Sequence, residues 1–198
     1  MEGDHFGEIG LLYNCPRTAT VIARNYNTMA KLRKDRFRDL VSQFPEFLEF
    51  LKKHSYRYNY KRKTFLMDAL QKIPYIQGQS KEIMNKLMYS MELQLMDKGE
   101  ILLKPGDDTN YFYIVESGCI EFVTEFEGNE FILEFLSQGS LINYHVVFSS
   151  DQVLLTIRAR EHTRLLVASE KMLNELMASD QQFNKSVLMF QNRLLKLK

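Results

Sequence analysis

The residues with the clearest chemical potential lie near the start of the chain, in the runs Gly3-Asp4-His5-Phe6-Gly7-Glu8-Ile9-Gly10 and Pro16-Arg17-Thr18-Ala19-Thr20-Val21. A glycine beside the start of a short helix lets backbone N–H groups approach a phosphate closely. The Glu8 carboxylate can accept a hydrogen bond from a sugar hydroxyl, and the Arg17 guanidinium can form a bidentate pair with an anionic phosphate. A surface ion pair between Glu8 and Arg17, worth about 0–1 kcal/mol, is the structural alternative.

The two runs together resemble the phosphate-binding cassette of cyclic nucleotide-binding domains, whose pattern is F-G-E-[LIV]-A-L followed by P-R-[TA]-A-T-V. The resemblance implies that cAMP or cGMP is the ligand, with no further cofactor and no metal. Gly10 departs from the pattern, because the family usually has alanine there. The implied binding residues are Gly7, Glu8, Ile9, Gly10, Arg17, Thr18 and Ala19.

Residues 66–198 resemble a second domain of the same family, with glycine turns at Lys104-Pro105-Gly106-Asp107 and at Ser117-Gly118-Cys119. Its cassette departs from the pattern: Asn143 or Tyr144 stands where the family has the sugar-binding glutamate, and no arginine occurs before Arg158. Because a buried anion without a partner is costly, we expect this domain to keep the fold without binding cyclic nucleotides in the usual way. The residues of this degenerate cassette are Gly139, Ser140, Asn143, Tyr144 and His145, and His145 is expected to be a hydrogen-bonded packing residue.

The pattern of apolar residues predicts the elements that position these cassettes. A helical period runs from about Lys34 to Gln71, with Pro45 at the start of a second helix, and helical spacing returns after Ser169. Between them, alternating residues and turn signals predict short strands, which favours an antiparallel barrel or jelly roll. The expected strands are Glu92–Met96, Ile101–Lys104, Tyr111–Ser117, Ile120–Phe126, Glu130–Leu136, Gln152–Ala159 and Thr163–Ala168.

The resulting fold class is mainly β with flanking helices: an antiparallel β-roll or jelly-roll barrel of the cyclic nucleotide-binding type, preceded by a partial copy and linking helices. The expected divisions are residues 1–33, the cassette and last strands of a first domain; 34–65, the linking helices; and 66–198, the second domain. Since only Met1-Glu2 precede the first motif, we expect the sequence to begin inside a domain and to bind nucleotide weakly or not at all at that cassette. Phe47, Phe50 and the tyrosines at 56, 58 and 60, which are expected to lie in a helix, could cover the purine or could pack against the second barrel.

Composition narrows the function. The formal net charge of +1 gives no overall field for a nucleic-acid polymer or an anionic membrane. The two cysteines suit a reducing compartment, and no apolar run is long enough to span a membrane, so a cytoplasmic region is expected. The four histidines are scattered along the sequence and predict no metal centre. We identify no nucleophile–base pair in the sequence, so an enzyme is not expected.

Three classes of regulatory protein remain open. The divergent second cassette favours a cyclic nucleotide-gated or voltage-gated potassium-type channel as the parent, because tandem kinase regulators usually keep both cassettes. A regulatory subunit of a cyclic nucleotide-dependent protein kinase and a non-binding scaffold are the alternatives. The expected partners are a cyclic nucleotide and the channel or kinase domains, with a homo-oligomer left open and any membrane contact confined to segments upstream.

Overall fold

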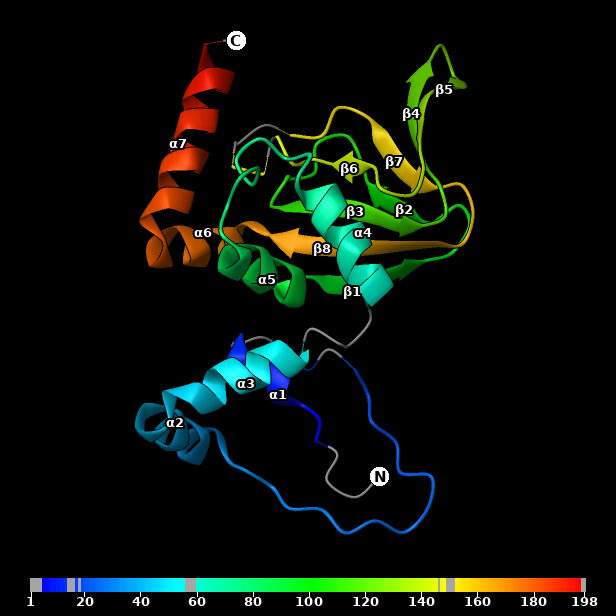
Figure 1. Ribbon diagram of the computed structural model, residues 1–198. Helices are drawn as coiled ribbons and strands as arrows, with labels where there is room; N and C mark the ends of the chain where they lie inside the picture. Colours follow the sequence, from blue (N-terminus) through cyan, green and yellow to red (C-terminus); the bar gives the residue numbers. More distant parts are fainter. Residues whose placement is uncertain are drawn as a thin grey trace. The chain divides into compact units, whose positions relative to one another are not determined.

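The computed structural model describes residues 5–13, 17, 19–55, 60–145, 147–148 and 152–196. The chain divides into two compact units, Met1–Lys63 and Thr64–Lys198. Figure 1 shows the helices of the first unit and the strands and helices of the second.

The first unit contains the short helix α1 (Glu8–Leu12), followed by α2 (Lys34–Gln43) and α3 (Pro45–Ser55). Pro45 begins α3, as predicted, because its missing N–H and fixed φ suit a first helical position. The buried Phe37 of α2 packs against Phe47 of α3, with ring centroids 6.5 Å apart. This contact assigns Phe47 a packing role within the first unit, and its proposed role over a purine stays a prediction.

The last strands expected within residues 1–33 are not formed, because residues 19–33 adopt no strand. A strand needs a neighbour that accepts and donates its backbone hydrogen bonds. The described residues of the first unit contain no other strand that could serve as that neighbour.

The second unit holds two four-stranded antiparallel sheets. One has the order β1-β8-β3-β6 and the other β2-β7-β4-β5, so β1, β6, β2 and β5 are edge strands and the pairings do not close a ring. The arrangement confirms the jelly-roll type of fold. The strands are β1 (Glu92–Met96), β2 (Ile101–Leu103), β3 (Tyr111–Ser117), β4 (Ile120–Phe126), β5 (Asn129–Leu136), β6 (Leu141–Ile142), β7 (Thr156–Ala159) and β8 (Thr163–Ser169).

Alternate residues of β3 and β8 face two different cores. Tyr113, Val115 and Leu165 pack with Met96, Ile142 and Ile157 between the two sheets. Phe112, Ile114, Leu166 and Ala168 point to the opposite face and pack against helices. These helices are α4 (Tyr60–Leu70), α5 (Lys81–Ser90), α6 (Glu170–Ser179) and α7 (Gln181–Leu195).

Three elements differ from the sequence-based expectations. The strand expected over Gln152–Ala159 is formed only at Thr156–Ala159, with Gln152 making an isolated bridge to Asp108. The two-residue β6 and the helix α5 were not predicted. The signal for α5 is present, since Ser80 caps Ile83 N–H at 3.2 Å and apolar side chains follow at helical spacing. Tyr56 and Tyr58, expected in a helix, lie outside the described residues.

Candidate functional site

The first cassette is built around Gly7, which precedes α1 with a φ of 83°. Glycine adopts this left-handed conformation without a steric penalty. A Cβ at this position would also lie 2.8 Å from Arg17 Nη1. Glu8, the first residue of α1, is buried with 7% of its surface exposed, while Ile9 and Gly10 are half-buried.

Arg17 joins the two halves of the motif, because its Nη1 donates a hydrogen bond to the Gly7 carbonyl oxygen. The structure therefore brings Gly7, Glu8 and Arg17 together across ten residues of chain. The Arg17 side chain is exposed, as is Ala19, and Thr18 lies outside the described residues. The Glu8–Arg17 ion pair considered as the structural alternative is not among the salt bridges of the described residues.

A hollow of about 420 Å³ adjoins this cassette and is strongly cationic. Its lining residues are Gly10, Leu11, Arg17, Lys31, Leu32, Arg33 and Lys34. Four of the seven carry a positive charge and none a negative one, so the hollow favours an anion. The sequence interpretation missed Lys31, Arg33 and Lys34, although residues 17–34 contain five Lys or Arg and no Asp or Glu.

The second cassette begins at Gly139, which is buried with a φ of 82°. Its N–H donates to Val115 O at 2.9 Å, and the N–H of Val115 donates to Ser140 O at 3.0 Å. Lys72 Nζ donates a hydrogen bond to the Gly139 carbonyl oxygen at 3.0 Å. The ammonium group of Lys72 is therefore already engaged with the backbone of this turn.

Asn143 has a φ of 60°, so it repeats the left-handed conformation of Gly7 at a non-glycine residue. The Asn143 carbonyl oxygen accepts a hydrogen bond from Val147 N–H at 3.1 Å. This bond spans four residues, as in one turn of an α-helix. His145 is exposed, and its ring lies 5.3 Å from that of Tyr144, so it packs against this ring at the surface and not in the core. Its expected role as a hydrogen-bonded packing residue stays a prediction. The turn directs its side chain outward instead of toward the core.

Tyr75 links the second cassette to the last helix. Its hydroxyl donates to the Tyr144 carbonyl oxygen at 3.1 Å, and its ring lies 5.6 Å from Phe148 and 5.1 Å from Phe190 of α7. Burial raises the pKa of Tyr75 well above its ordinary value, so the hydroxyl stays protonated and donates. These contacts connect the second cassette to the helices packed around Tyr75.

Arg158, the first arginine after the second cassette, is paired with two carboxylates. Its Nε lies 2.6 Å from Glu121 and its Nη1 lies 3.0 Å from Glu130. The hydrogen bonds to Glu121 and then Glu130 raise the pKa of Arg158 above its ordinary value. Both acids lie on β4 and β5, so Arg158 cannot serve a phosphate at Asn143 without giving up these partners.

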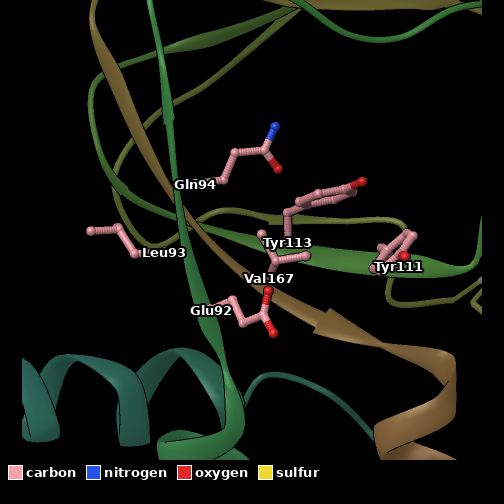
Figure 2. A pocket seen from close by; sticks show the side chains of 6 residues that line it. All are labelled: Glu92, Leu93, Gln94, Tyr111, Tyr113 and Val167. Atoms are coloured by element: carbon pink, nitrogen blue, oxygen red, sulfur yellow. The ribbon is translucent and has the colours of Figure 1, made fainter. Parts of the chain in front are cut away.

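A hollow of about 350 Å³ lies along the β1-β8-β3 part of the second unit (Figure 2). Figure 2 shows the side chains of Glu92, Tyr111, Tyr113 and Val167 gathered on one side of β1, with Leu93 on the other. The complete lining is Glu92, Leu93, Gln94, Tyr111, Tyr113 and Val167. It contains one carboxylate and no cation, which is the opposite charge balance to the hollow of the first unit.

The two units repeat one another with a constant offset. Helices α2 and α6 begin 136 positions apart, at residues 34 and 170, and α3 and α7 begin at residues 45 and 181 with the same separation. Thr20-Val21-Ile22-Ala23 then matches Thr156-Ile157-Arg158-Ala159. This offset pairs Glu8 with Tyr144 and Arg17 with Val153, a core residue that is 7% exposed.

The family model described as "Cyclic nucleotide-binding domain" matches residues 1–44 and 93–180. The chain belongs to the cyclic nucleotide-binding domain family. Because the two matched segments end at corresponding positions of the repeat, this cyclic nucleotide-binding chain contains family sequence twice. The resemblance read from the cassette residues is confirmed.

Curated relatives of this cyclic nucleotide-binding chain are protein kinase components. The cAMP-dependent protein kinase regulatory subunit of Schizosaccharomyces pombe is 22% identical over 178 residues, covering 89% of this chain and 39% of the relative. The cGMP-dependent protein kinase 2 of Homo sapiens is 25% identical over 184 residues, covering 91% of this chain and 22% of the relative. The chain thus spans well under half the length of either relative.

A solved cyclic nucleotide-binding domain from Methylobacillus flagellatus shares the fold, with a TM-score of 0.57 and 19% identity over 69% of this chain and 78% of that one. Among the described residues, no helix combines the length and apolar character that a membrane span requires. Those residues also contain no cluster of three His, Cys, Asp or Glu side chains that could hold a metal ion.

The hydroxyl of Tyr113 gives the second unit a predicted sensitivity to alkali. Burial, with smaller contributions from Tyr111 and Asp107, raises the pKa of Tyr113 from 10.0 to about 12. Between these pH values the unfolded chain loses the proton and the folded chain keeps it, so stability that is complete below pH 10 falls as the pH rises toward 12. Urea unfolding measured across this pH range is expected to show that the free energy of unfolding falls less steeply with pH in Tyr113→Phe than in the unchanged protein. The remaining fall in the variant would come from Tyr75. The fully exposed Tyr26, changed to Phe, should leave the decline unchanged, and equal declines in all three proteins would contradict the assignment.

Proposed function

We propose that this chain is a cyclic nucleotide-sensing regulatory module in which the first cassette binds cAMP or cGMP and the second does not. The observation that carries the proposal is the charge contrast between the two units. The hollow beside the first cassette holds Arg17, Lys31, Arg33 and Lys34, whereas the offset of the repeat places Val153, Val167, Ser169 and Glu170 at the corresponding positions of the second unit. A cyclic phosphate, which carries one negative charge, is favoured at the first and disfavoured at the second.

The proposed ligand contacts follow from the positions of three groups. Arg17 would pair with the phosphate, the backbone N–H groups that follow Gly7 would approach it, and the buried Glu8 would accept from a ribose hydroxyl. In the second cassette, the repeat assigns Tyr144 and Val153 to the positions of Glu8 and Arg17, so neither ligand group is present. We propose that the second unit serves as a fixed support.

Residues 1–33 are proposed to be the C-terminal part of a first cyclic nucleotide-binding domain. By the offset of the repeat they correspond to residues 137–169, which in the second unit include β6, β7 and β8. There β7 and β8 pair with β2, β4, β1 and β3. The described residues of the first unit contain no counterparts of β1 to β5, so full affinity at the first cassette is expected to need them.

The kinase relatives support a regulator of a cyclic nucleotide-dependent protein kinase as the parent, which was the alternative reading of the sequence. The preferred reading, a potassium-type channel, gains no support from the comparisons. A degenerate second cassette is compatible with kinase regulation, because one responsive cassette suffices to couple nucleotide binding to a conformational equilibrium.

The test measures binding of cAMP and cGMP by calorimetry to residues 1–198 and to a chain extended at its N-terminus by strands that complete the first cyclic nucleotide-binding domain. The expected result is weak or undetectable binding to residues 1–198 and a gain of at least about tenfold in affinity on extension. The extended protein should also inhibit the catalytic subunit of a cAMP-dependent protein kinase, with inhibition relieved by the nucleotide that binds.

Extension without any gain in affinity would overturn the proposed site. A gain in affinity without kinase inhibition would keep the site and reject the kinase assignment. Binding that survives at residues 1–198 and is lost on changing Asn143 or His145 would place the ligand in the second cassette instead.

A further inference from the structure

Strand β5 forms an open edge of the β2-β7-β4-β5 sheet. It pairs with β4 from Ile120↔Leu136 to Phe126↔Asn129, so alternate backbone N–H and C=O groups of β5 point away from the sheet. The tip of the β4–β5 hairpin projects beyond the other strands of the second unit (Figure 1). At this tip the outer side of β5 is open to a further strand.

The side chains around this edge are unusually apolar for an exposed surface. Natural proteins usually protect edge strands with lysine, proline or a short length, but the eight residues of β5 include neither Lys nor Pro. A bulge at Leu133 interrupts the pairing, because Phe122 faces Glu134 while Val123 faces Ile132. The exposed apolar residues are Phe126 at 64%, Phe131 at 50%, Ile132 at 46%, Leu133 at 57% and Phe135 at 50%.

The same hairpin is uniformly acidic. Between Ile120 and Leu136 every charged residue is a glutamate, five in all, and none is Lys, Arg or Asp. Arg158 pairs with Glu121 and Glu130. No ion pair of the described residues engages the other three, which are Glu125, Glu127 and Glu134. The hairpin therefore combines an open strand edge, exposed apolar side chains and a net negative charge.

We propose that the β5 edge, at Asn129–Ile132, binds an extended polypeptide segment in which apolar residues alternate with Lys or Arg. The segment would pair with β5 as an added antiparallel strand, with its backbone satisfying the outward groups of β5. Its apolar side chains would cover Phe126 and Phe131 on one face of the sheet, and its cations would lie near Glu125 on the other face. The bulge at Leu133 limits regular pairing to the part of β5 nearest the hairpin tip.

The charge pattern disfavours two other occupants. Two copies paired β5 to β5 would bring the five glutamates of each hairpin together, and in the register about Ile132 Glu130 of one copy would directly face Glu134 of the other, which is destabilising. An anionic lipid surface would likewise be repelled by the glutamates. A strand that carries Lys or Arg and apolar residues is attracted by the glutamates and is not subject to either repulsion.

The test uses the full chain and a short fluorescent peptide of alternating valine and lysine, with a matched peptide in which glutamate replaces lysine. Fluorescence anisotropy is expected to show binding of the lysine peptide at least about tenfold tighter than of the glutamate peptide. Added salt should weaken it, because the glutamates are exposed. Hydrogen exchange should show new protection of β5 amides.

Two matched variants separate the β5 edge from the rest of the sheet. Phe131→Lys places a cation on β5 and should reduce affinity for the lysine peptide at least about tenfold. Ile101→Lys changes a residue of similar exposure, 44%, on the opposite edge strand β2 and should leave affinity unchanged. Equal binding of both peptides, an unaffected Phe131→Lys protein, protection away from β5, or a β5-dependent dimer or vesicle complex would each overturn the proposal.

Discussion

Replacing Arg17 by glutamine is expected to weaken cyclic nucleotide binding to the upstream-extended protein at least about twenty-five-fold. Removing one partner of a hydrogen-bonded charge pair in a binding site costs about 2–5 kcal/mol, and each 1.4 kcal/mol changes affinity about tenfold. Arg17 contacts the Gly7 carbonyl oxygen, so its guanidinium lies at the point where backbone N–H groups and the phosphate would meet. Calorimetry with cAMP and cGMP measures the loss.

The matched control is Arg24→Gln. Arg24 belongs to the same cationic segment and is exposed, but it does not line the hollow beside the first cassette. If the segment acts only through its general charge, the two variants should lose similar affinity and similar salt dependence. A loss confined to Arg17 supports a direct phosphate contact, while equal losses would contradict it.

The difference between the two cassettes explains what the sequence could and could not predict. Gly7, Glu8 and Arg17 were identifiable because their residue types carry the chemistry, and Gly7 and Arg17 then meet in the structure. Lys31, Arg33 and Lys34 lie further along the chain from the motif and join the hollow only through the fold of the first unit. The sequence shows that these three residues are basic, but it does not show that they lie near the cassette in space.

The helices and strands show the same division between local and long-range information. Strands β1, β3 and β4 have the residue bounds that were predicted, because alternation and glycine turns are local signals. Strand β6 has only two residues, and it exists because Leu141 and Ile142 pair with Ile114 and Tyr113 nearly thirty residues earlier. The expected strands of residues 19–33 fail for the converse reason, since their sequence is suitable but their partners are absent from the described first unit.

The role of Arg158 also depended on a long-range contact. The sequence places it two residues after Thr156 on a strand, but does not place it beside Glu121 of the neighbouring β4 and Glu130 of β5, the next strand beyond. Those contacts make Arg158 a structural residue of the second unit. They also support the view that the second unit lost its phosphate-binding residues while its fold was retained.

Replacing Gly118 by alanine is expected to destabilise the second unit by about 3 kcal/mol. Gly118 joins β3 to β4 with a φ of 90°, where an alanine would carry about 1–2 kcal/mol of backbone strain. Its Cβ would lie 2.5 Å from Thr163 Oγ1, 2.6 Å from His162 O and 2.7 Å from Thr163 Cα, and overpacking of this kind adds about 1–3 kcal/mol. Urea denaturation of the full chain, followed by far-ultraviolet circular dichroism, measures the change.

The neighbouring atoms cannot move aside, because Thr163 is fully buried and its hydroxyl donates to Glu161 O at 2.9 Å and accepts from Cys119 N–H at 3.2 Å. Gly128→Ala is the matched control: its φ is 76°, but no atom lies within 4 Å of the added Cβ, so only the strain of about 1–2 kcal/mol remains. If both alanines cost the same, the close approach of the β3–β4 turn to β8 contributes nothing. A larger loss at Gly118 shows that the β3–β4 turn packs too closely against β8 to admit a Cβ, so this position requires glycine for space as well as for its backbone conformation.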